Sequence, residues 1–345
     1  MKIVVAPDSF KECLPARLVA SVLASAFRES VPGCEVVECP LADGGEGTAE
    51  ILTAALGGRM CTATVTGPLG KPVEAAFGVA GELGILDVAS ACGLALIPPE
   101  RRNPLYTTTR GVGELILAAL GEGCRHIVVG LGGSATCDGG EGMLSVPGLR
   151  SAASGVRLTV LCDVDTPFIG PSGAARVFGP QKGASPSDVE ALEQRMTNVA
   201  ARLRADTGVD VRSVPGAGAA GGLGGAFLAC FGAELVSGVE EVLRLTGFDQ
   251  AIAGADLIVT GEGRSDRQTL AGKVPYGVLQ HASGNAGIPV ALLSGRIEDP
   301  SALLEAGFRH LVAVSPPDLP LAEALCPSVA AANLRRAATR LLKAQ

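Results

Sequence analysis

The sequence has little of what a nucleic-acid-binding, membrane-bound or disulfide-rich protein needs. Its 345 residues carry a net charge of −7 at pH 7 and a pI near 5.2, which opposes nonspecific attraction to nucleic acid or to an anionic membrane. The ten cysteines include no CxxC pair, so the spacing of a metal cluster or disulfide framework is missing. We expect reduced thiols, and neither nucleic acid nor membrane as a partner.

Familiar catalytic and targeting motifs are also missing. The chain has no GxxxxGK[ST] P-loop, no HRD or DFG motif and no HExxH or GxSxG motif, which excludes the enzyme classes that depend on them. The three histidines abut predicted strands or lie on a predicted helix, so we interpret them as structural. Met1 is followed directly by the strand-like KIVVA, without a basic region and an apolar signal-peptide core, so we expect a cytoplasmic location. The uncharged, glycine-rich stretch 213–233 is expected to be a loop and a buried helix rather than a membrane span.

Six short apolar runs are each bounded by loops of Gly, Asp, Ser or Pro. Helix-like segments with apolar residues at three- and four-residue spacings accompany them, at 16–28, 48–56, 111–120 and 301–306. This alternation is typical of a mostly parallel, Rossmann-like or flavodoxin-like α/β domain. The predicted strands are 2–7, 35–40, 125–133, 256–263, 289–295 and 310–316.

Two segments depart from this pattern. Residues 61–87 alternate and break at GPLGKP and GELG, as antiparallel hairpins do. Residues 141–244 include a polar helix opened by Ser185 or Ser187 as N-cap. We therefore predict a discontinuous Rossmann-like domain with a second, inserted α/β domain and the active site in the cleft between them. The predicted boundaries are 1–59, 92–134 and 245–345 for the first domain, and 60–91 and 135–244 for the inserted one.

The loops after the predicted strands are unusually polar and glycine-rich. In an open parallel sheet, ligands bind beyond the carboxyl ends of the strands, where glycine lets backbone N–H groups approach phosphate. Carboxylates beside phosphate need a hard divalent cation between them, typically Mg²⁺. The combination indicates magnesium-dependent phosphoryl transfer. The loops are Asp8-Ser9-Phe10-Lys11, Asp43-Gly44-Gly45-Glu46-Gly47-Thr48, Gly132-Gly133-Ser134-Ala135-Thr136-Cys137-Asp138, Gly261-Glu262-Gly263-Arg264-Ser265-Asp266 and Ser294-Gly295-Arg296.

Lysine is scarce and its positions are informative. Of 28 basic residues only six are lysine, and four of these lie in turn or loop contexts. Lysines held in loops are candidates for compact charges on phosphate. We interpret Lys71 as a solvated turn residue and Lys182 and Lys273 as phosphate ligands.

Taken together, the loops resemble the type I glycerate kinases, the bacterial glycerate 2-kinases. The matching phrases occur in family order over nearly the whole chain. They are APDSFK (6–11), LADGGEGT (41–48), VTGPLGKPV (65–73), RNPLYTTTRGVGELI (102–116), GLGGSATCDGGEGML (130–144), CDVDTPFIGPSGAARVFGPQKGA (162–184), PGAGAAGGLG (215–224) and TGEGRSDRQTLAGKVPYGV (260–278).

The resemblance implies ATP-dependent phosphorylation of (R)-glycerate to 2-phosphoglycerate with Mg²⁺, in a two-domain protein. A homodimer is one assembly that the sequence leaves open. The chain departs from the family at Glu12-Cys13, where a small Gly-Ser pair is usual, and at Cys137, where Asn is usual. The stretch 144–157 is also shorter than in family members. The missing residues would form either a peripheral hairpin or a cap on the cleft.

Candidate roles follow for individual side chains. Asp43, Asp138 and Asp163 are the leading carboxylates for base or metal roles, with Asp43 and Asp138 as metal ligands, and helix capping beside glycine as the alternative. Glu141, in the second DGGEG, is interpreted as incidental. Lys182 is placed in the catalytic set and, with Lys273, on nucleotide phosphates.

The remaining candidates are assigned to the two ligands. For glycerate we expect Arg264 on the carboxylate, with a surface ion pair as its alternative, together with Asp8, Ser9, Lys11 and Ser134. For the nucleotide we expect Gly44, Gly45, Gly132, Gly133, Gly261, Glu262, Gly263, Asp266 and Lys273, with Glu262 capping a helix as its alternative.

Two other classes of function stay open. A nicotinamide-dependent hydroxyacid dehydrogenase would share the sheet, although Gly130, Gly132 and Gly133 lack the dinucleotide-binding spacing. A noncatalytic glycerate-binding relative of the kinase is favoured only by the shortened segment.

Overall fold

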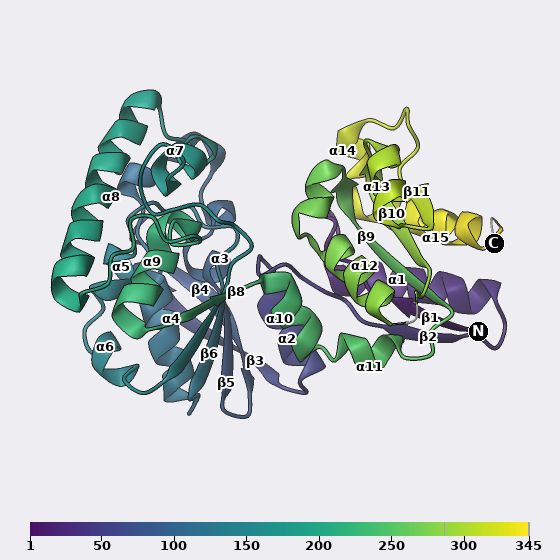
Figure 1. The fold of residues 1–345 in the computed structure, drawn as a ribbon, viewed down its shortest axis with the longest axis horizontal. Helices are drawn as coiled ribbons and strands as arrows, with labels where there is room; N and C mark the ends of the chain where they lie inside the picture. Colours follow the sequence, from purple (N-terminus) through teal and green to yellow (C-terminus); the bar gives the residue numbers. More distant parts are fainter. Residues whose placement is uncertain (286, 344–345) are drawn as a thin grey trace. The chain divides into compact units, whose positions relative to one another are not determined.

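The structure is a computed structural model that describes residues 1–285 and 287–343. The chain forms two compact units, each with one β-sheet and its own helices (Figure 1). Unit 1 consists of Met1–Asp43 and Val239–Gln345, and unit 2 of Gly44–Gly238. The protein is therefore a mixed α/β protein, and its chain crosses from one unit to the other twice.

The sheet of unit 1 is parallel throughout, with the order β11-β10-β9-β1-β2. Near its centre Val4 pairs with Val37 on one side and with Ile258 on the other. All carboxyl ends of the strands therefore lie along one edge of the sheet. The strands are β1 (Lys2–Val5), β2 (Glu35–Glu38), β9 (Leu257–Ser265), β10 (Val290–Ile297) and β11 (His310–Ala313).

Helices cover both faces of this sheet. Ile3 and Val5 alternate with Val4 along β1, and they share a core with buried residues of α1 and α15. Figure 1 shows α12 on the other side of the sheet from α1. The helices of unit 1 are α1 (Ala16–Ser30), α10 (Gly238–Leu245), whose first residue ends unit 2, α11 (Phe248–Ile252), η5 (Arg267–Ala271), α12 (Val274–Gly284), α13 (Pro300–Ala306), α14 (Leu321–Ala324) and α15 (Pro327–Lys343).

The sheet of unit 2 is mixed, with the order β3-β4-β5-β6-β7-β8. Strands β3, β4 and β5 are antiparallel neighbours, whereas β5 to β8 run parallel. The hairpins predicted over 61–87 are thereby confirmed. The strands are β3 (Arg59–Thr66), β4 (Pro72–Ala80), β5 (Leu83–Asp87), β6 (His126–Gly130), β7 (Arg157–Leu161) and β8 (Glu234–Val236).

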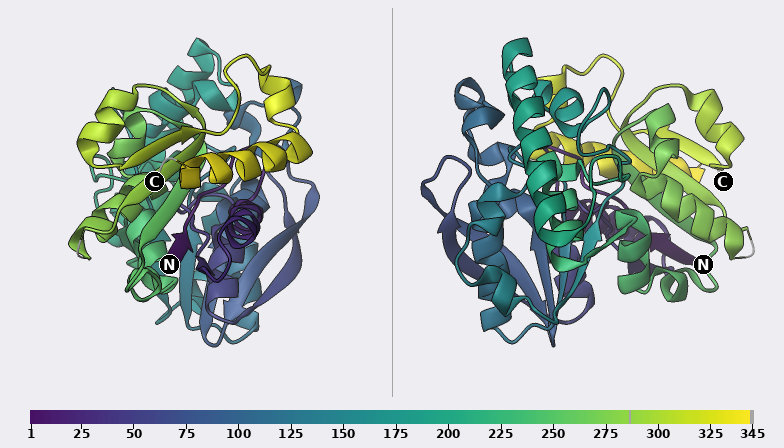
Figure 2. Two further views of the ribbon diagram at one scale, coloured as in Figure 1. Left: turned by 90° about the vertical axis from the view of Figure 1, so that its right-hand side faces the viewer. Right: turned by 60° about the vertical axis from the view of Figure 1, so that its left-hand side comes forward.

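Unit 2 has two cores. One joins the sheet to α4 and α9, and the other lies among α7, α8 and α9; the long helix α8 is plain in the right-hand view of Figure 2. The helices are α2 (Thr48–Ala55), α3 (Val88–Cys92), η1 (Leu94–Leu96), η2 (Pro99–Arg101), η3 (Pro104–Tyr106), α4 (Arg110–Gly121), α5 (Glu141–Leu144), α6 (Leu149–Ala152), α7 (Ala174–Phe178), η4 (Pro180–Lys182), α8 (Pro186–Thr207) and α9 (Ala219–Phe231).

One strand was assigned to the wrong sheet. The sequence placed 125–133 in the same sheet as 2–7, but β6 pairs with β5 and β7 in unit 2. The reason is that an apolar run in the sequence indicates a buried strand but does not indicate which strand it pairs with. The two units consequently have boundaries that differ from the predicted 1–59, 92–134 and 245–345 against 60–91 and 135–244.

Two local predictions, the N-cap of a polar helix and a buried helix within 213–233, are confirmed. Ser185 is the N-cap of α8, where its hydroxyl accepts from Asp188 N and the Asp188 carboxylate accepts from Ser185 N. The stretch 213–233 contains the buried helix α9. Across residues 1–285 and 287–343, no helix is long and apolar enough to span a membrane.

The segment 144–157, expected from the sequence to be short for the family, packs against its own unit. Between β6 and β7 the chain forms only the short helices α5 and α6. Val146 and Leu149 are buried there, and they lie so close to Gly113 of α4 that a Cβ at Gly113 would be 2.9 Å from Val146 Cγ2. The short connection therefore closes on the helix α4 without leaving its apolar residues exposed.

Candidate active site

The carboxyl edge of the unit 1 sheet gathers charged side chains from loops far apart in the sequence. Asp8 follows β1, Asp43 lies beyond β2, and Glu262 is on β9. The Asp8 side chain is buried, and Ser9 N donates to its Oδ1 at 2.6 Å. The ammonium of Lys11 lies 3.9 Å from Asp43 Oδ2. The predicted substrate-binding residues Asp8, Ser9 and Lys11 therefore meet the predicted catalytic Asp43.

Asp8 is perturbed by this environment. Burial and the nearby charge of Asp43 raise the pKa of Asp8 to about 7, and the Ser9 N–H and Lys11 only partly oppose the shift. When two carboxylates lie close together, the negative charge of one disfavours ionisation of the other. A shared proton or a bound cation relieves this repulsion. The pair Asp8 and Asp43 is thus suited to hold a cation or to accept a proton near neutral pH.

Glu262 holds a network of its own at the same sheet edge. Its Oε1 accepts from Ser265 Oγ at 3.0 Å and from Thr269 Oγ1 at 2.7 Å, and its Oε2 lies 3.2 Å from Lys273 Nζ. Glu262 is 6% exposed. Its carboxylate therefore fixes Lys273, the residue that precedes α12, and connects two residues that were both predicted to contact the nucleotide.

The other predicted groups on β9 and directly after it have structural partners. Arg264 lies 2.6 Å from Glu298 and 3.6 Å from Asp266 in an exposed ion-pair network, and Asp266 caps η5 by accepting from Gln268 N. Gly261 lies against β10, where an added Cβ would be 1.9 Å from the Leu293 carbonyl oxygen. Gly263 packs beside Phe10 and Lys11. For Arg264 the geometry matches the surface ion pair, the alternative that the sequence left open.

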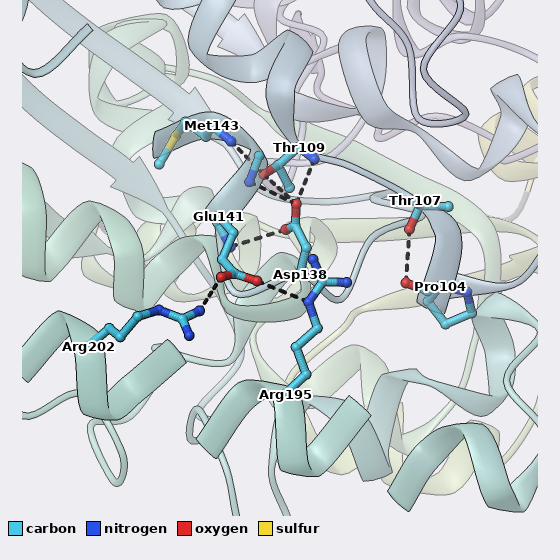
Figure 3. A network of polar contacts seen from close by, with 10 residues as sticks. Pro104, Thr107, Thr109, Asp138, Glu141, Met143, Arg195 and Arg202 are labelled. Atoms are coloured by element: carbon cyan, nitrogen blue, oxygen red, sulfur yellow. Dashed lines mark hydrogen bonds and ion pairs between the residues drawn. The ribbon is translucent and has the colours of Figure 1, made fainter. Parts of the chain in front are cut away.

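Asp138, in unit 2, is saturated with hydrogen bonds (Figure 3). Its Oδ2 accepts from Thr109 N and Oγ1, both at 2.9 Å, and from Gly142 N at 3.1 Å; its Oδ1 accepts from Gly140 N at 3.1 Å. Thr109 Oγ1 in turn accepts from Met143 N. Asp138 is 1% exposed, so its carboxylate ties the start of α4 to the start of α5 and has the geometry of a helix cap.

Glu141 also has a defined contact. Its carboxylate accepts hydrogen bonds from Arg195 Nε at 3.0 Å and from the guanidinium of Arg202, two residues of α8 (Figure 3). The carboxylate of Glu141 therefore links α5 to α8, and its being incidental to the functional site stays a prediction. The sequence carried no sign of this contact, since its partners lie more than fifty residues along the chain.

Lys182 is a buried ammonium at the end of η4. It is 4% exposed and donates to Ser134 Oγ at 2.9 Å and to Thr136 O at 2.7 Å. Burial lowers the pKa of Lys182, although the nearby Asp138 and two cysteine thiols oppose the shift. A buried cation whose contacts are a hydroxyl and a carbonyl is suited to an anionic ligand. The predicted residues Lys182 and Ser134 thus meet in unit 2.

The glycines of the two repeated loops meet backbone to backbone. Gly132 N donates to Gly44 O at 3.2 Å, and a Cβ at Gly132 would lie 2.5 Å from Gly45 Cα. Only glycine permits this approach. Gly133 has a left-handed backbone with φ of 76°, and its carbonyl accepts from Leu94 N. Gly44, Gly45, Gly132 and Gly133 therefore shape one loop cluster in unit 2.

Two further aspartates cap helices. Asp163 Oδ1 accepts from Ser237 Oγ and from Gly238 N, the first residue of α10. Asp87 was missed by the sequence analysis: at the end of β5, its two oxygens accept from Gly47 N and Ala49 N at 2.9 and 3.0 Å, at the start of α2. The sequence does contain a signal for Asp87. It ends the run GELGILD, and the candidates Asp8 and Asp43 likewise follow predicted strands.

A magnesium site has to be tested against these contacts. Within residues 1–285 and 287–343 there is no group of three or more His, Cys, Asp or Glu side chains that could hold a metal ion. Mg²⁺ in kinases needs only one or two carboxylates besides phosphate oxygens. The pair Asp8 and Asp43 fits this requirement, because its repulsion is what a cation relieves. Asp138 does not fit, because four donors occupy its carboxylate.

An α/β protein whose strand ends carry paired carboxylates, fixed lysines and glycine loops belongs to the class of phosphate-handling enzymes. Comparisons with known proteins identify the family. The model of the glycerate kinase family matches residues 3–154 and 144–345, two ranges that overlap at 144–154. The chain therefore belongs to the glycerate kinase family, and it is a phosphotransferase with an alcohol group as acceptor.

Individual relatives agree with this assignment. The chain is 42% identical to a glycerate kinase of Bacillus subtilis, over 94% of this chain and 93% of the relative. It is 43% identical to the glycerate 2-kinase of Escherichia coli, over 87% and 86%. A crystal structure described as a glycerate kinase 2 from Salmonella typhimurium LT2 superposes with a TM-score of 0.85 at 40% identity, covering 100% of this chain and 98% of the other.

Proposed function

We propose that this protein is an ATP-dependent glycerate kinase that transfers the γ-phosphoryl group to the 2-hydroxyl of (R)-glycerate and forms 2-phosphoglycerate. The observation that carries the chemistry is the pair of carboxylates Asp8 and Asp43 beside Lys11 at the carboxyl edge of the unit 1 sheet. The relatives named glycerate kinase support glycerate as the acceptor, and the name of the glycerate 2-kinase supports transfer to the 2-hydroxyl.

Asp8 and Asp43 are the residues that would hold Mg²⁺. When bound, the ion neutralises charge on the phosphate oxygens, which is the main electrostatic task in phosphoryl transfer. A carboxylate oxygen of the pair is our candidate for the group that accepts the proton of the attacking hydroxyl. Asp138 and Asp163, expected to share these roles, act in this proposal as helix caps.

Three lysines supply positive charge. Lys11 lies beside Asp43, Lys273 is fixed by Glu262, and Lys182 is held by Ser134 and Thr136. We assign Lys182 and Lys273 to nucleotide phosphates and Lys11 to glycerate. Because a loose phosphoryl-transfer transition state depends on positioning and electrostatics, fixed ammonium groups contribute more than mobile ones. That the ligands bind between the two units stays a prediction.

An ADP-release assay tests the function. The purified protein is given ATP, Mg²⁺ and a panel of small hydroxy acids that includes both enantiomers of glycerate, lactate and glycolate. We expect release with (R)-glycerate above the other acids, and ³¹P and ¹H NMR should show phosphate on carbon 2. Absence of ADP release with either enantiomer would sink the proposal, and phosphate on carbon 3 would overturn its regiochemistry.

Two lysine substitutions in unit 2 test the role of Lys182. Lys182→Met keeps the length of the side chain and removes its charge, and we expect kcat to fall by about 100-fold, roughly 3 kcal/mol of transition-state stabilisation. Lys71→Met is the matched control in a solvated turn and should stay within about twofold, as surface changes usually do. Similar activities for the two variants would contradict the role of Lys182.

A further inference from the structure

A tight turn directly follows the Asp8 loop in unit 1. Phe10 and Leu14 form an isolated bridge in which each backbone N–H donates to the other's carbonyl, and Cys13 N donates to Phe10 O. Glu12 has a left-handed backbone with φ of 61°, which is uncommon for a residue other than glycine. The turn 10–14 thus holds Cys13 two residues after Lys11, in a fixed backbone.

A second cysteine stands at the start of the last helix. Cys326 immediately precedes α15, and it is the one exposed residue among the ten cysteines. Its Sγ lies 3.4 Å from Ser328 Oγ. Hydrogen bonds from the Ser328 hydroxyl and from the Val329 and Ser328 N–H groups lower the pKa of Cys326. A thiol at a helix N-terminus with such donors is the usual form of a reactive cysteine.

The two cysteines are neighbours in space although 313 positions separate 13 from 326. Cys13 Sγ–H donates to Ala324 O at 3.9 Å, two residues before Cys326. Burial raises the pKa of Cys13, and so does the charge of Cys326. Cys326 is therefore placed to react first, and Cys13 is placed to react with it.

The other cysteines have different surroundings. Burial raises the pKa of Cys39 and Cys137 to about 11 and that of Cys92 to about 12. Buried thiols of this kind are inert. Reactivity toward an oxidant should therefore be low at these three cysteines.

We propose that Cys326 is a site of oxidation by hydrogen peroxide, and that Cys13 resolves it into a disulfide that ties the turn 10–14 to the segment before α15. The Cys326 thiolate attacks one peroxide oxygen, the O–O bond breaks, and a sulfenic acid and hydroxide form. The Cys13 sulfur, as its thiolate, attacks the Cys326 sulfur and displaces hydroxide. In sum, two thiols and one peroxide give one disulfide and two waters, and two electrons pass from sulfur to peroxide.

The bridge would regulate the site assigned above, and this part rests on the proposed function. The turn 10–14 contains Lys11, whose ammonium lies 3.9 Å from Asp43, and follows Asp8. A bond between Cys13 and Cys326 would restrict the turn and change the position of Lys11. Oxidation should therefore lower kinase activity reversibly.

The disulfide itself is tested without any activity measurement. Reduced, full-length protein is treated with a few equivalents of hydrogen peroxide, remaining thiols are alkylated, and peptides are separated without reductant for mass spectrometry. We expect a cross-linked peptide pair containing Cys13 and Cys326 that dithiothreitol removes. Cys13→Ser should accumulate sulfenic acid at Cys326, detectable with dimedone, and Cys326→Ser should give neither product. Cys34→Ser, a half-buried cysteine elsewhere in unit 1, is the control and should still form the bridge.

Two results would overturn the site. One is wild-type protein in which Cys326 is oxidised to sulfinic or sulfonic acid while Cys13 remains a free thiol and is alkylated. The other is a disulfide between Cys326 and a different cysteine. ADP release in the same samples tests the regulation. We expect at least a fivefold loss in the oxidised wild type, recovery with dithiothreitol, and no loss in Cys13→Ser. Unchanged activity in fully bridged protein would overturn the regulation alone. Should glycerate release no ADP even before oxidation, the proposed function fails while the mass spectra still decide the disulfide.

Discussion

The same five residues, DGGEG, occur twice, and their two aspartates lie in very different environments. Asp138 is 1% exposed and accepts hydrogen bonds from four donors of its own unit. The Asp43 side chain is 30% exposed, lies 3.9 Å from Lys11, and raises the pKa of a neighbouring carboxyl group, Asp8. The comparison teaches that a motif does not define a role: one copy holds helices together, and the other stands with charged groups at a sheet edge.

The largest expected effect is on stability. Asp138→Ala leaves buried N–H groups and the Thr109 hydroxyl without their acceptor, and we expect the free energy of unfolding to fall by about 4 kcal/mol. Asp43→Ala should change it by less than about 1 kcal/mol, because the side chain is part-exposed. Urea unfolding followed by circular dichroism measures both. Equal losses in the two variants would remove the distinction.

Turnover should show the reverse order. Asp43→Asn removes a charge that we assign to the Mg²⁺ pair, and kcat should fall by about 100-fold or more, roughly 3 kcal/mol. Asp138→Asn, assayed at a temperature where it is folded, should keep kcat within about tenfold, because its carboxylate is assigned to helix caps. Steady-state ADP release provides the measurement. A larger kcat loss in Asp138→Asn than in Asp43→Asn would restore the metal role that the sequence suggested for Asp138.

A third effect is the pH dependence of the unfolding free energy that Asp8, the neighbour of Asp43, should cause. The pKa of Asp8 is raised from 3.8 to about 7 in the folded state, so the folded state binds the proton more tightly than the unfolded state. Stability from this group is present below pH 4 and is lost as pH rises to 7. In EDTA, Asp8→Asn should therefore gain about 2 kcal/mol relative to wild type between pH 5 and pH 8.

Denaturant unfolding at the two pH values measures this difference. Asp318→Asn, which changes an exposed carboxylate, serves as the control and should show no comparable trend. A pH-independent difference between Asp8→Asn and wild type would show that Asp8 is not perturbed.

The smallest effect concerns Arg264, which the sequence assigned to the glycerate carboxylate. Its ion pairs with Glu298 and Asp266 are exposed, and such pairs contribute little. We expect Arg264→Ala to change the unfolding free energy by less than about 0.5 kcal/mol and KM for glycerate by less than twofold. A tenfold rise in KM with unchanged KM for ATP would return Arg264 to the substrate.

Much of this protein was determined by the sequence alone. The helices beginning at 16 and 48, the hairpins of 61–87 and the capping serine of α8 were all predicted. Each of these features depends on neighbours within a few residues, where apolar periodicity, turn glycines and capping side chains act directly. The polar loops at strand ends were also predicted as a group, because parallel strands place their carboxyl ends together.

Only the tertiary structure decided what those loops contact. Strand β6 pairs with β5 and β7 because all three are buried strands and the packing of α4 and α9 brings them together. Asp138 became a helix cap because Thr109, 29 residues earlier, supplies two donors. The pKa of Asp8 is raised because its carboxyl group is buried and because Asp43, which follows the neighbouring strand, lies nearby. Hydrogen-bond satisfaction and desolvation depend on groups from distant segments, so a local pattern could nominate these carboxylates but could not distinguish their roles.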